Sequence, residues 1–312
     1  MIQSITPISR TNYNYKKNNK TPLYNKNLSH DTANISFKGQ SAFYKFHPFN
    51  YFCNKLLQRS LTVSRSRFLS KAPELRGKIK NVTIKTIDNK NLICWDINPK
   101  KSKKYILFLH GMSQNITHNQ PLYSALNKNG YGVMALEYRG FGANKKTKVS
   151  EELISLDTDA ALEYLKKKTS SKNISVIGHS AGSAIALELA RKNNGLGRVI
   201  LIAPINGIGR TATNLLATTK KNYIPKFVKK FITKYPSIIE PFNQVFKTDN
   251  KIANVSSPTY IIHSANDKII PLKSAKELSK KAKNLKAFIQ LPLGGHRLGD
   301  NKIETIINIL KN

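Results

Sequence analysis

The stretch that decides the fold of this 312-residue chain is Gly178-His179-Ser180-Ala181-Gly182, which reads G-x-S-x-G. It stands between an apolar run, residues 173–177, and an alanine-rich run of helical character, residues 181–190. A strand that turns sharply into a helix at a serine strains the backbone and exposes the hydroxyl, and the flanking glycines allow close chain approach. The motif alone also occurs in structural turns, but the flanking strand and helix favour Ser180 as a nucleophile.

The general base for Ser180 is selected by chain order. A serine hydroxyl needs a base, the base needs an orienting carboxylate, and in this kind of fold the order is Ser, Asp or Glu, His. Five of the seven histidines come before Ser180: His30, His47, His110, His118 and His179. His263 lies inside an apolar, strand-like run, residues 259–263. His296, in the Gly-rich segment 293–297, is therefore the predicted base, and the alternative is a surface loop histidine.

The carboxylate is predicted to be Asp267. It follows the strand-like run 259–263 across a short turn, and the crevice at the carboxyl ends of strands is where active sites of open α/β sheets lie. The loop after the previous strand, residues 204–207, holds no carboxylate. Asp249 and Asp300 have no strand in front of them and are expected to be solvated.

Two backbone N–H groups are needed to stabilise the oxyanion of a tetrahedral intermediate. One is expected from Ala181, directly after the nucleophile, and the other from Met112, after the apolar run 104–109 and Gly111. His110 precedes Ser180 in the chain, so a structural role in holding this loop is the favoured interpretation of it.

With these residues the chain resembles the α/β-hydrolase superfamily, most of all the single-domain branch of acyl-protein and lipid esterases and serine-aminopeptidase-like proteins. The resemblance covers about residues 78–312. Five stretches carry it, in the family's order: His110–Asn115, Gly130–Gly142, Gly178–Gly182, His263–Pro271 and Gly294–His296. Two positions depart from the family's pattern: Glu137 replaces the usual Asp, and Ser264 replaces a usual Gly. Neither departure removes a catalytic group, and we expect Ser264 at most to stiffen the loop of the acid.

The periodicity of apolar residues predicts the same fold class. Two runs, 82–87 and 92–97, enclose the hairpin signal 88–91. Further strands are predicted at 105–109, 132–136, 174–177, 199–203, 259–263 and 287–291, and helices at 151–168, 273–283 and 302–311. Alternating strands and helices predict an α/β fold with a doubly wound, mainly parallel sheet, antiparallel at its start, and a helical cap insert over residues 206–254.

Composition indicates how the chain is divided into segments and where the protein is expected to reside. Residues 1–77 are interpreted as a low-complexity, largely disordered segment with an aromatic cluster at 43–52, and 78–312 as the hydrolase domain. The cluster is expected to pack on the core, with membrane contact as the alternative. Two cysteines imply no disulfide framework, and neither a signal peptide nor a transmembrane run is read, so we expect a cytoplasmic protein.

The formal net charge of +35 is the strongest competing signal. Alone it suggests a binder of nucleic acid or anionic membrane, but the lysines are spread along the chain without a nucleic-acid-binding motif, so compositional bias is favoured. Residues 224–235 are organised, with an apolar helical face opposite Lys226, Lys229, Lys230 and Lys234. We expect a roof over the active site, and the alternative is weak docking of this helix on an anionic lipid surface.

The sequence thus predicts a serine hydrolase that cleaves an ester or thioester through an acyl-enzyme on Ser180, with Asp267 and His296 completing the triad. The expected partner is a small-molecule or lipid-like acyl substrate. No metal, organic cofactor or specific nucleic acid is implied, and the oligomeric state is not readable. Two alternatives stay open: a peptidase or amidase with the same triad, and a catalytically vestigial basic protein associated with membranes or nucleic acid.

Overall fold

The computed structural model of this protein describes residues 69–112, 114–144, 147, 149–207, 209, 211 and 246–312. Their strands are β1 (Ile79–Lys85), β2 (Asn91–Ile97), β3 (Tyr105–Leu109), β4 (Gly132–Leu136), β5 (Ile174–His179), β6 (Val199–Ile202), β7 (Thr259–Ser264) and β8 (Leu285–Leu291). The helices are α2 (Gln120–Lys128), α3 (Glu151–Lys166), α4 (Ala181–Lys192), α8 (Asp249–Ile252), α9 (Leu272–Lys281) and α10 (Asp300–Lys311). Short 3₁₀ turns occur at Pro73–Leu75, Ile116–Asn119, Gly142–Asn144 and Ser171–Asn173.

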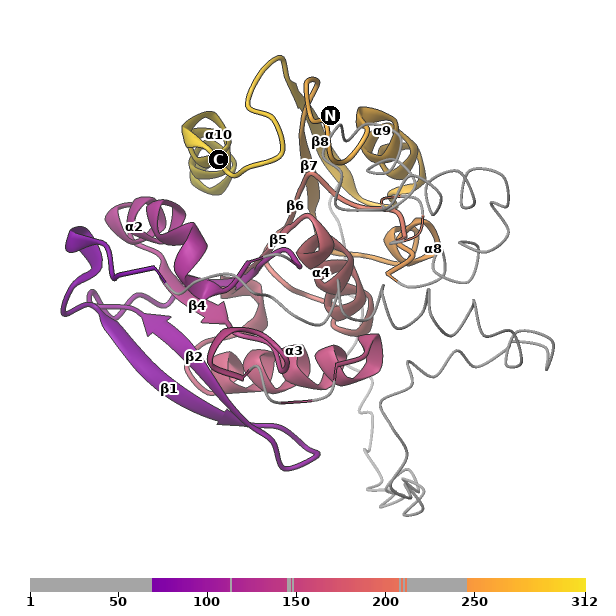
Figure 1. The fold of residues 1–312 in the computed structure, drawn as a ribbon. Helices are drawn as coiled ribbons and strands as arrows, with labels where there is room; N and C mark the ends of the chain where they lie inside the picture. Colours follow the sequence, from indigo (N-terminus) through magenta and orange to yellow (C-terminus); the bar gives the residue numbers. More distant parts are fainter. Residues whose placement is uncertain are drawn as a thin grey trace, which may run out of the picture. The chain divides into compact units, whose positions relative to one another are not determined.

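The strands form one eight-stranded sheet in the order β1-β2-β4-β3-β5-β6-β7-β8 (Figure 1). β2 pairs antiparallel with β1 and β4, and every later pairing is parallel. The predicted mainly parallel sheet with an antiparallel start is therefore confirmed. Because β3, β5, β7 and β8 run in the same direction, the loops that follow them meet at one edge of the sheet.

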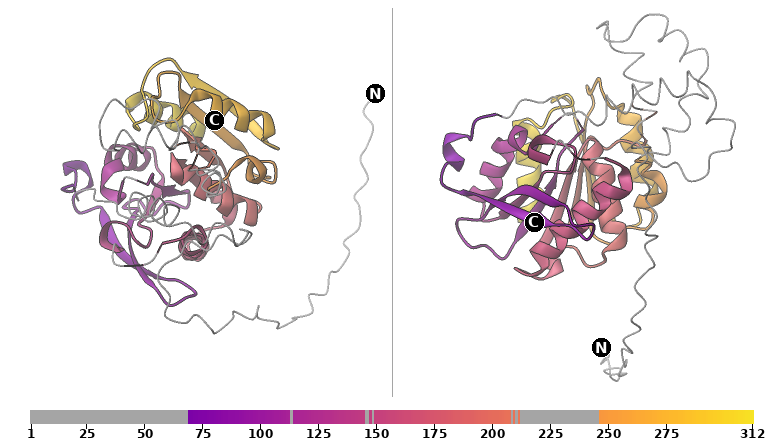
Figure 2. Two further views of the ribbon diagram at one scale, coloured as in Figure 1. Left: turned by 45° about the vertical axis from the view of Figure 1, so that its right-hand side comes forward. Right: turned by 60° about the horizontal axis from the view of Figure 1, so that its bottom comes forward.

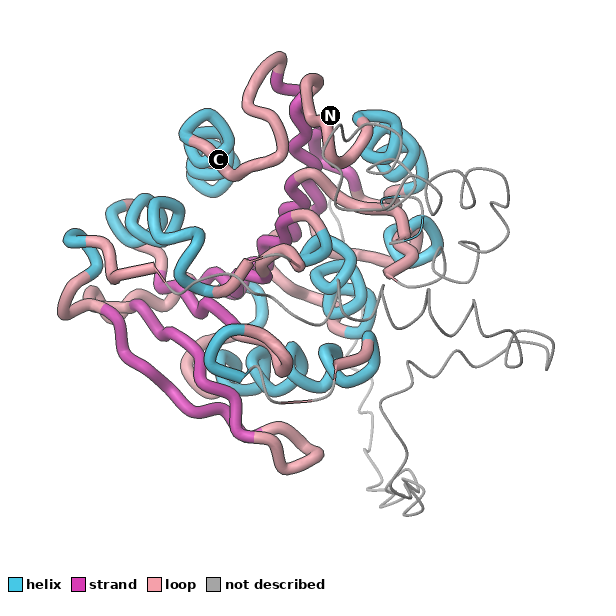
Figure 3. Tube along the Cα trace, in the orientation of Figure 1, coloured by secondary structure: helices cyan, strands magenta, loops and turns pink. Residues whose placement is uncertain are grey.

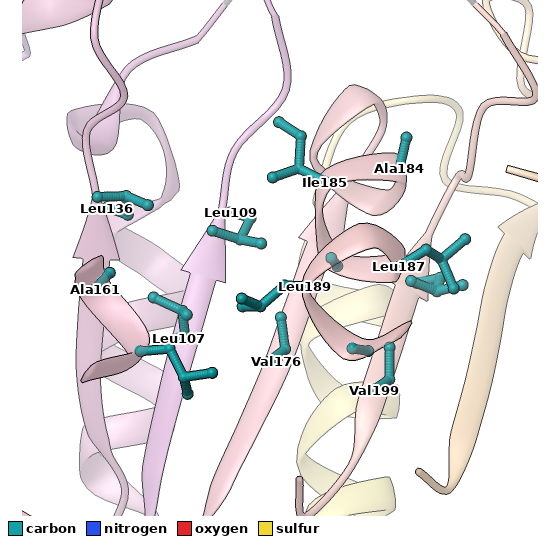
Figure 4. Close-up of a cluster of buried hydrophobic side chains, with 14 of the residues drawn as sticks. Leu107, Leu109, Leu136, Ala161, Val176, Ala184, Ile185, Leu187, Leu189 and Val199 are labelled. Carbon is teal, nitrogen blue, oxygen red and sulfur yellow. The ribbon is translucent and has the colours of Figure 1, made fainter. Parts of the chain in front are cut away.

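Helices cover both faces of the sheet (Figure 2). In Figure 3 the strands lie between α2 and α10 on one side and α3, α4, α8 and α9 on the other. Each face has its own buried apolar cluster. Side chains of α3, α4 and α9 pack with Leu107, Val176 and Val199 in the larger cluster, part of which is drawn in Figure 4. The second cluster joins α2 and α10 to the opposite face, through residues such as Ile106 and Ile306.

Capping residues and apolar runs in the sequence account for the ends of several helices and strands. Ser150 caps α3, where its side chain accepts a hydrogen bond from the N–H of Leu153 at 3.2 Å. Such a cap satisfies one of the unpaired amides of the first helical turn. The predicted helix 151–168 is confirmed with an end at Lys166, and β1 begins and ends earlier than the predicted run 82–87.

The packed part of the chain begins before residue 78, where the sequence places the start of the domain. Leu75 is buried in the second apolar cluster, and the N–H of Ala72 donates to Oε1 of Gln120 at 2.6 Å. The aromatic cluster 43–52, the rest of the N-terminal segment up to residue 68, and the amphipathic stretch 224–235 lie outside the described residues. So does most of the predicted cap insert 206–254.

Candidate active site

Ser180 lies at the junction of β5 and α4, on a sharp turn of the backbone. Its dihedral angles are φ 56° and ψ −121°, which strain a residue with a side chain. The turn is held by the Ser180 N–H, which donates to the Ile202 carbonyl at 2.8 Å, and by Ser183 Oγ, which donates to the Ser180 carbonyl at 2.5 Å. The strained conformation is the geometry of a nucleophile elbow.

The two glycines of the motif are required by close backbone approach. A Cβ at Gly178 would lie 2.3 Å from the carbonyl oxygen of Gly182. A Cβ at Gly182 would lie 2.1 Å from the carbonyl oxygen of Leu109, at the end of β3. The small residues therefore allow α4 to start directly against β3 and β5.

The structure brings together the three side chains that the sequence selects. Nε2 of His296 lies 3.1 Å from Oγ of Ser180, and Nδ1 of His296 lies 2.9 Å from Oδ2 of Asp267. The Asp267 side chain is fully buried, whereas that of His296 is 16% exposed. In this arrangement Nδ1 of the imidazole faces the carboxylate as a hydrogen-bond donor, and Nε2 faces the Ser180 hydroxyl as an acceptor.

Asp267 is held as an oriented carboxylate. Its Oδ1 accepts hydrogen bonds from the N–H groups of Ile269 at 2.8 Å and Ile270 at 2.9 Å, which leaves Oδ2 for His296. Burial by itself raises the pKa of Asp267. The hydrogen bond and charge of His296, together with the two backbone N–H groups, lower the pKa by more than burial raises it. The net pKa lies below the ordinary value, so Asp267 is ionised at neutral pH.

Two other histidines near the site are buried and do not compete as the base. His263 donates from Nε2 to the Ile270 carbonyl at 3.0 Å, and burial lowers its pKa. His179 donates from Nε2 to the backbone carbonyl of His296 at 2.9 Å. Burial, together with the neighbouring His296, lowers the pKa of His179 to about 3. Both imidazoles are therefore neutral at physiological pH and act as hydrogen-bond donors to backbone.

The loop after β3 lies against Ser180. A Cβ at Gly111 would be 3.3 Å from Cβ of Ser180, so the backbone of this loop passes directly beside the serine. The Gly111 N–H is engaged by Oε1 of Gln114 at 3.2 Å. The amide of Met112 is the next one along the loop, and that of Ala181 opens α4 beside Ser180.

His110 attaches this loop to the residues that follow β4. Its ring is buried, with Nε2 3.1 Å from Oε1 of Glu137, and its carbonyl accepts a hydrogen bond from the Tyr138 hydroxyl at 3.2 Å. The second oxygen of Glu137 accepts from the N–H of Ile116 at 3.3 Å. Glu137, one of the two departures from the family's pattern, thus holds the loop through His110.

Several residues around the triad were missed by sequence reasoning. They are His179, Gln114, Asn266, Asn301 and Lys302, each of which hydrogen-bonds backbone of the loop after β3 or of the loop that carries His296. His179 lies inside the G-x-S-x-G motif, which could have drawn attention to it. No local pattern identifies the others, because their partners are loop backbone atoms rather than a motif.

The described residues contain no cluster of three or more His, Cys, Asp or Glu side chains arranged to hold a metal ion. They also contain no helix with the length and apolar character needed to cross a bilayer. Burial raises the pKa of Cys94, the cysteine within these residues, to about 12, so this thiol is unreactive.

Comparison with known proteins places this site in a family context. Residues 100–244 match the family described as serine aminopeptidase, S33. The human protein ABHD12B is 25% identical over 198 residues, which cover 61% of this chain and 53% of that protein. The zebrafish (Danio rerio) lysophosphatidylserine lipase ABHD12 is 27% identical over 205 residues, covering 64% of this chain and 51% of that protein. The match thus spans about half the length of these relatives.

Solved structures agree on the fold. The Pyrococcus furiosus esterase Pf2001 superposes with a TM-score of 0.61 at 22% identity, over 78% of this chain and 96% of that one. An acetyl xylan esterase from Paenibacillus sp. R4 has a TM-score of 0.61 at 15% identity, over 84% of this chain and 93% of that one. The sheet order, the strained serine elbow and these likenesses together identify the chain as a member of the α/β-hydrolase superfamily.

Proposed function

We propose that this protein is a serine hydrolase that cleaves a carboxylic ester or thioester through an acyl-enzyme on Ser180. The observation that carries the proposal is the continuous hydrogen-bonded chain from Ser180 through His296 to Asp267, with distances of 3.1 and 2.9 Å. A serine on a strained elbow, with an imidazole in reach and a buried carboxylate behind it, meets the geometric requirements for nucleophilic acyl transfer.

The steps follow from this geometry. Nε2 of His296 takes the hydroxyl proton as Oγ of Ser180 attacks the acyl carbon and a new C–O bond forms. The amides of Met112 and Ala181 stabilise the oxyanion of the tetrahedral intermediate. As the intermediate collapses, the bond to the leaving alcohol or thiol breaks and His296 gives it the proton. Water, deprotonated by His296, then attacks the acyl carbon of the acyl-enzyme. The bond to Oγ of Ser180 breaks, His296 returns the proton to Oγ, and the acid is released.

Asp267 contributes through the imidazole. Its carboxylate accepts the Nδ1 proton of His296, which holds the tautomer with a free lone pair on Nε2. Because its own pKa lies below the ordinary value, Asp267 is negatively charged when the imidazolium forms and stabilises that positive charge.

A lipid-like ester is the proposed substrate class. The support comes from the relatives, among which ABHD12 of zebrafish is named a lysophosphatidylserine lipase, and from structural neighbours named esterases. A peptidase or amidase is the second candidate, because the matching family is described as serine aminopeptidase. The same triad performs both reactions, so the substrate rather than the machinery distinguishes them.

One experiment tests the proposal. Purified protein and its Ser180→Ala variant are incubated with a fluorophosphonate probe, then assayed on p-nitrophenyl esters of increasing acyl length and on aminopeptidase substrates. We expect labelling and ester hydrolysis by the wild type, and a loss in the variant on the order of 10⁴ to 10⁶ in kcat. Hydrolysis by a folded Ser180→Ala protein at the wild-type rate would rule out the acyl-enzyme. Preference for aminopeptidase substrates would favour the second candidate.

Weak contact with an anionic lipid surface is proposed as an accessory property. Its basis is the sequence pattern of Lys226, Lys229, Lys230 and Lys234, since each lysine near such a surface adds about 1 kcal/mol. Changing all four to Gln should weaken co-sedimentation with anionic vesicles at low salt and leave hydrolysis of a soluble ester unchanged. A suitable control changes the exposed Lys276, Lys280, Lys283 and Lys286 to Gln, because these lie on α9, on β8 and on the short segment between them, away from residues 224–235 in the chain. An equal loss in the control would assign the effect to net charge.

A further inference from the structure

Lys302, in the first turn of α10, is a buried lysine whose charge has no carboxylate partner within the described residues. Its exposed fraction is 0%, and its Nζ lies beyond ion-pair distance of every described acidic side chain. A buried ammonium is costly unless each N–H finds an acceptor. Here the acceptors are three backbone carbonyl oxygens, those of Gly295 at 2.5 Å, Arg297 at 2.7 Å and Gly294 at 3.5 Å.

These carbonyls flank His296 on both sides. Residues 293–297 belong to no helix or strand, so their carbonyls have no ladder or helical partner. Gly294 and Gly295 both have positive φ, 125° and 56°, a pair of conformations that turns successive peptide groups in directions other residues rarely allow. The turn directs the carbonyls of the loop toward one point, and the Lys302 ammonium occupies that point.

Side chains from other elements hold the rest of this loop. Asn301 donates to the Leu293 carbonyl at 2.8 Å, Asn266 accepts from the Gly295 N–H at 2.8 Å, and His179 donates to the His296 carbonyl at 2.9 Å. Each of these groups binds one backbone atom. Lys302 is different, because a single compact cation joins the residues before and after the imidazole.

Packing of α10 does not depend on this charge. The helix buries an apolar face against the sheet, made by Ile303, Ile306, Ile307, Ile309 and Leu310. A lysine that served only to attach the helix would be redundant beside these contacts. Burial lowers the pKa of Lys302, and the Asp267 carboxylate opposes that shift. The negative charge of the triad therefore favours the charged form of Lys302.

We infer that Lys302 is a positioning residue for His296: its ammonium ties the backbone on both sides of the imidazole to α10 and keeps Nε2 at hydrogen-bond distance from Ser180. This inference rests on the proposed serine hydrolase function. Lys302 itself touches no reacting atom. Its effect is on the fraction of time in which the Ser180–His296–Asp267 chain is assembled, and a small displacement of a catalytic group costs a large factor in rate.

The test compares Lys302→Met with Lys311→Met. Methionine keeps most of the apolar volume of lysine and removes all three donors, and Lys311 is an exposed lysine at the other end of the same helix. For Lys302→Met we expect kcat on a soluble ester to fall by at least about tenfold, with KM changed by less than about threefold, because the loss concerns the chemical step. Lys311→Met should resemble the wild type in both constants.

A spectroscopic readout separates positioning from folding. The proton between Nδ1 of His296 and Asp267 is expected to give a far-downfield ¹H resonance in the wild type and in Lys311→Met. In folded Lys302→Met this resonance should broaden or vanish while the apolar core signals persist. Wild-type kcat and an unchanged resonance in folded Lys302→Met would overturn the inference.

Two further outcomes are decisive. If Lys302→Met does not fold, Lys302→Gln, which keeps amide donors without the charge, is measured in the same way. Failure of both variants to fold would show that Lys302 is needed for stability and would overturn the positioning role. If the wild type hydrolyses no substrate, the proposed function fails. The resonance comparison still decides the role of Lys302 in that case, because it needs no turnover.

Discussion

Nε2 of His179 donates a hydrogen bond to the backbone carbonyl of His296 at 2.9 Å, so the residue before Ser180 also holds the loop that carries His296. The other ring nitrogen of His179 lies 3.3 Å from Oε1 of Gln114, and the same oxygen accepts the N–H of Gly111. One imidazole therefore joins the turn at Ser180 to the loop that carries His296, and its unprotonated Nδ1 lies beside the loop after β3 without donating to it.

We expect His179→Leu to lower kcat by about tenfold or more, because a loosened His296 loop reduces the fraction of assembled triad. His179→Gln keeps an N–H donor and should retain more activity than His179→Leu. Steady-state kinetics on one soluble ester, with circular dichroism to check folding, makes the measurement. Wild-type rates in both variants would show that the hydrogen bond between His179 and the His296 carbonyl does not contribute to catalysis.

Replacement of the base and acid should give a graded loss. His296→Ala is expected to be almost as inactive as Ser180→Ala, since the two residues act as a unit, and Asp267→Asn somewhat less so. The matched control is His263→Ala, which removes a buried imidazole from β7 that contacts Ile270 rather than Ser180. Loss of stability is expected in this control, with labelling by a fluorophosphonate retained in the folded fraction. An inactive His263→Ala beside an active His296→Ala would contradict the assignment of the base.

Gly182→Ala should destabilise the fold. Its Cβ would lie 2.1 Å from the Leu109 carbonyl oxygen and 2.7 Å from that of His110, and backbone on a central strand cannot move away cheaply. We expect a loss of about 3 kcal/mol or more in the free energy of unfolding, measured by urea denaturation. Gly195→Ala is the control, because Gly195 has φ +82° with nothing within 4 Å of an added Cβ. Backbone strain alone should cost this variant about 1 kcal/mol, and an equal loss at both sites would refute the steric argument.

Low pH should weaken the ion pair between Asp88 and Arg139, which joins the β1–β2 hairpin to the segment after β4. Asp88 accepts hydrogen bonds from both terminal nitrogens of Arg139, at 2.6 and 2.9 Å, and these lower its pKa from 3.8 to about 2. Because the folded pKa lies below the unfolded one, the contribution of Asp88 to stability is complete above about pH 5 and declines as the pH falls toward 2.

The measurement is the difference in unfolding free energy between the wild type and Asp88→Asn, followed by fluorescence of the single tryptophan, the buried Trp95. This difference should shrink between pH 5 and pH 2, the range that spans the folded and unfolded pKa values. Asp159→Asn, which removes a partly exposed pair with Lys192, is the control and should change stability by no more than about 1 kcal/mol at neutral pH. A difference for Asp88→Asn that is independent of pH would contradict the assignment.

The sequence alone determined the fold class and the chain order of the candidate nucleophile, acid and base. Strand and helix periods are local, so the runs at 105–109, 132–136 and 259–263 could be assigned without a partner strand. Ser180 could be singled out because an elbow needs a particular local pattern of glycines between a strand and a helix. Asp267 and His296 then followed from chain order and from the end of a parallel strand, which is also a local property.

Only the tertiary structure decided which groups hold those three residues in place. Lys302, Gln114 and His179 bind backbone atoms of loops, and such contacts leave no periodic trace in the sequence. Arg139 reaches Asp88 across 51 residues of chain, and the partner of Glu137 became clear only when β3 and β4 paired. Side-chain type and spacing specify what a segment can become. The distance between two remote segments is set by how the whole sheet and its helices pack.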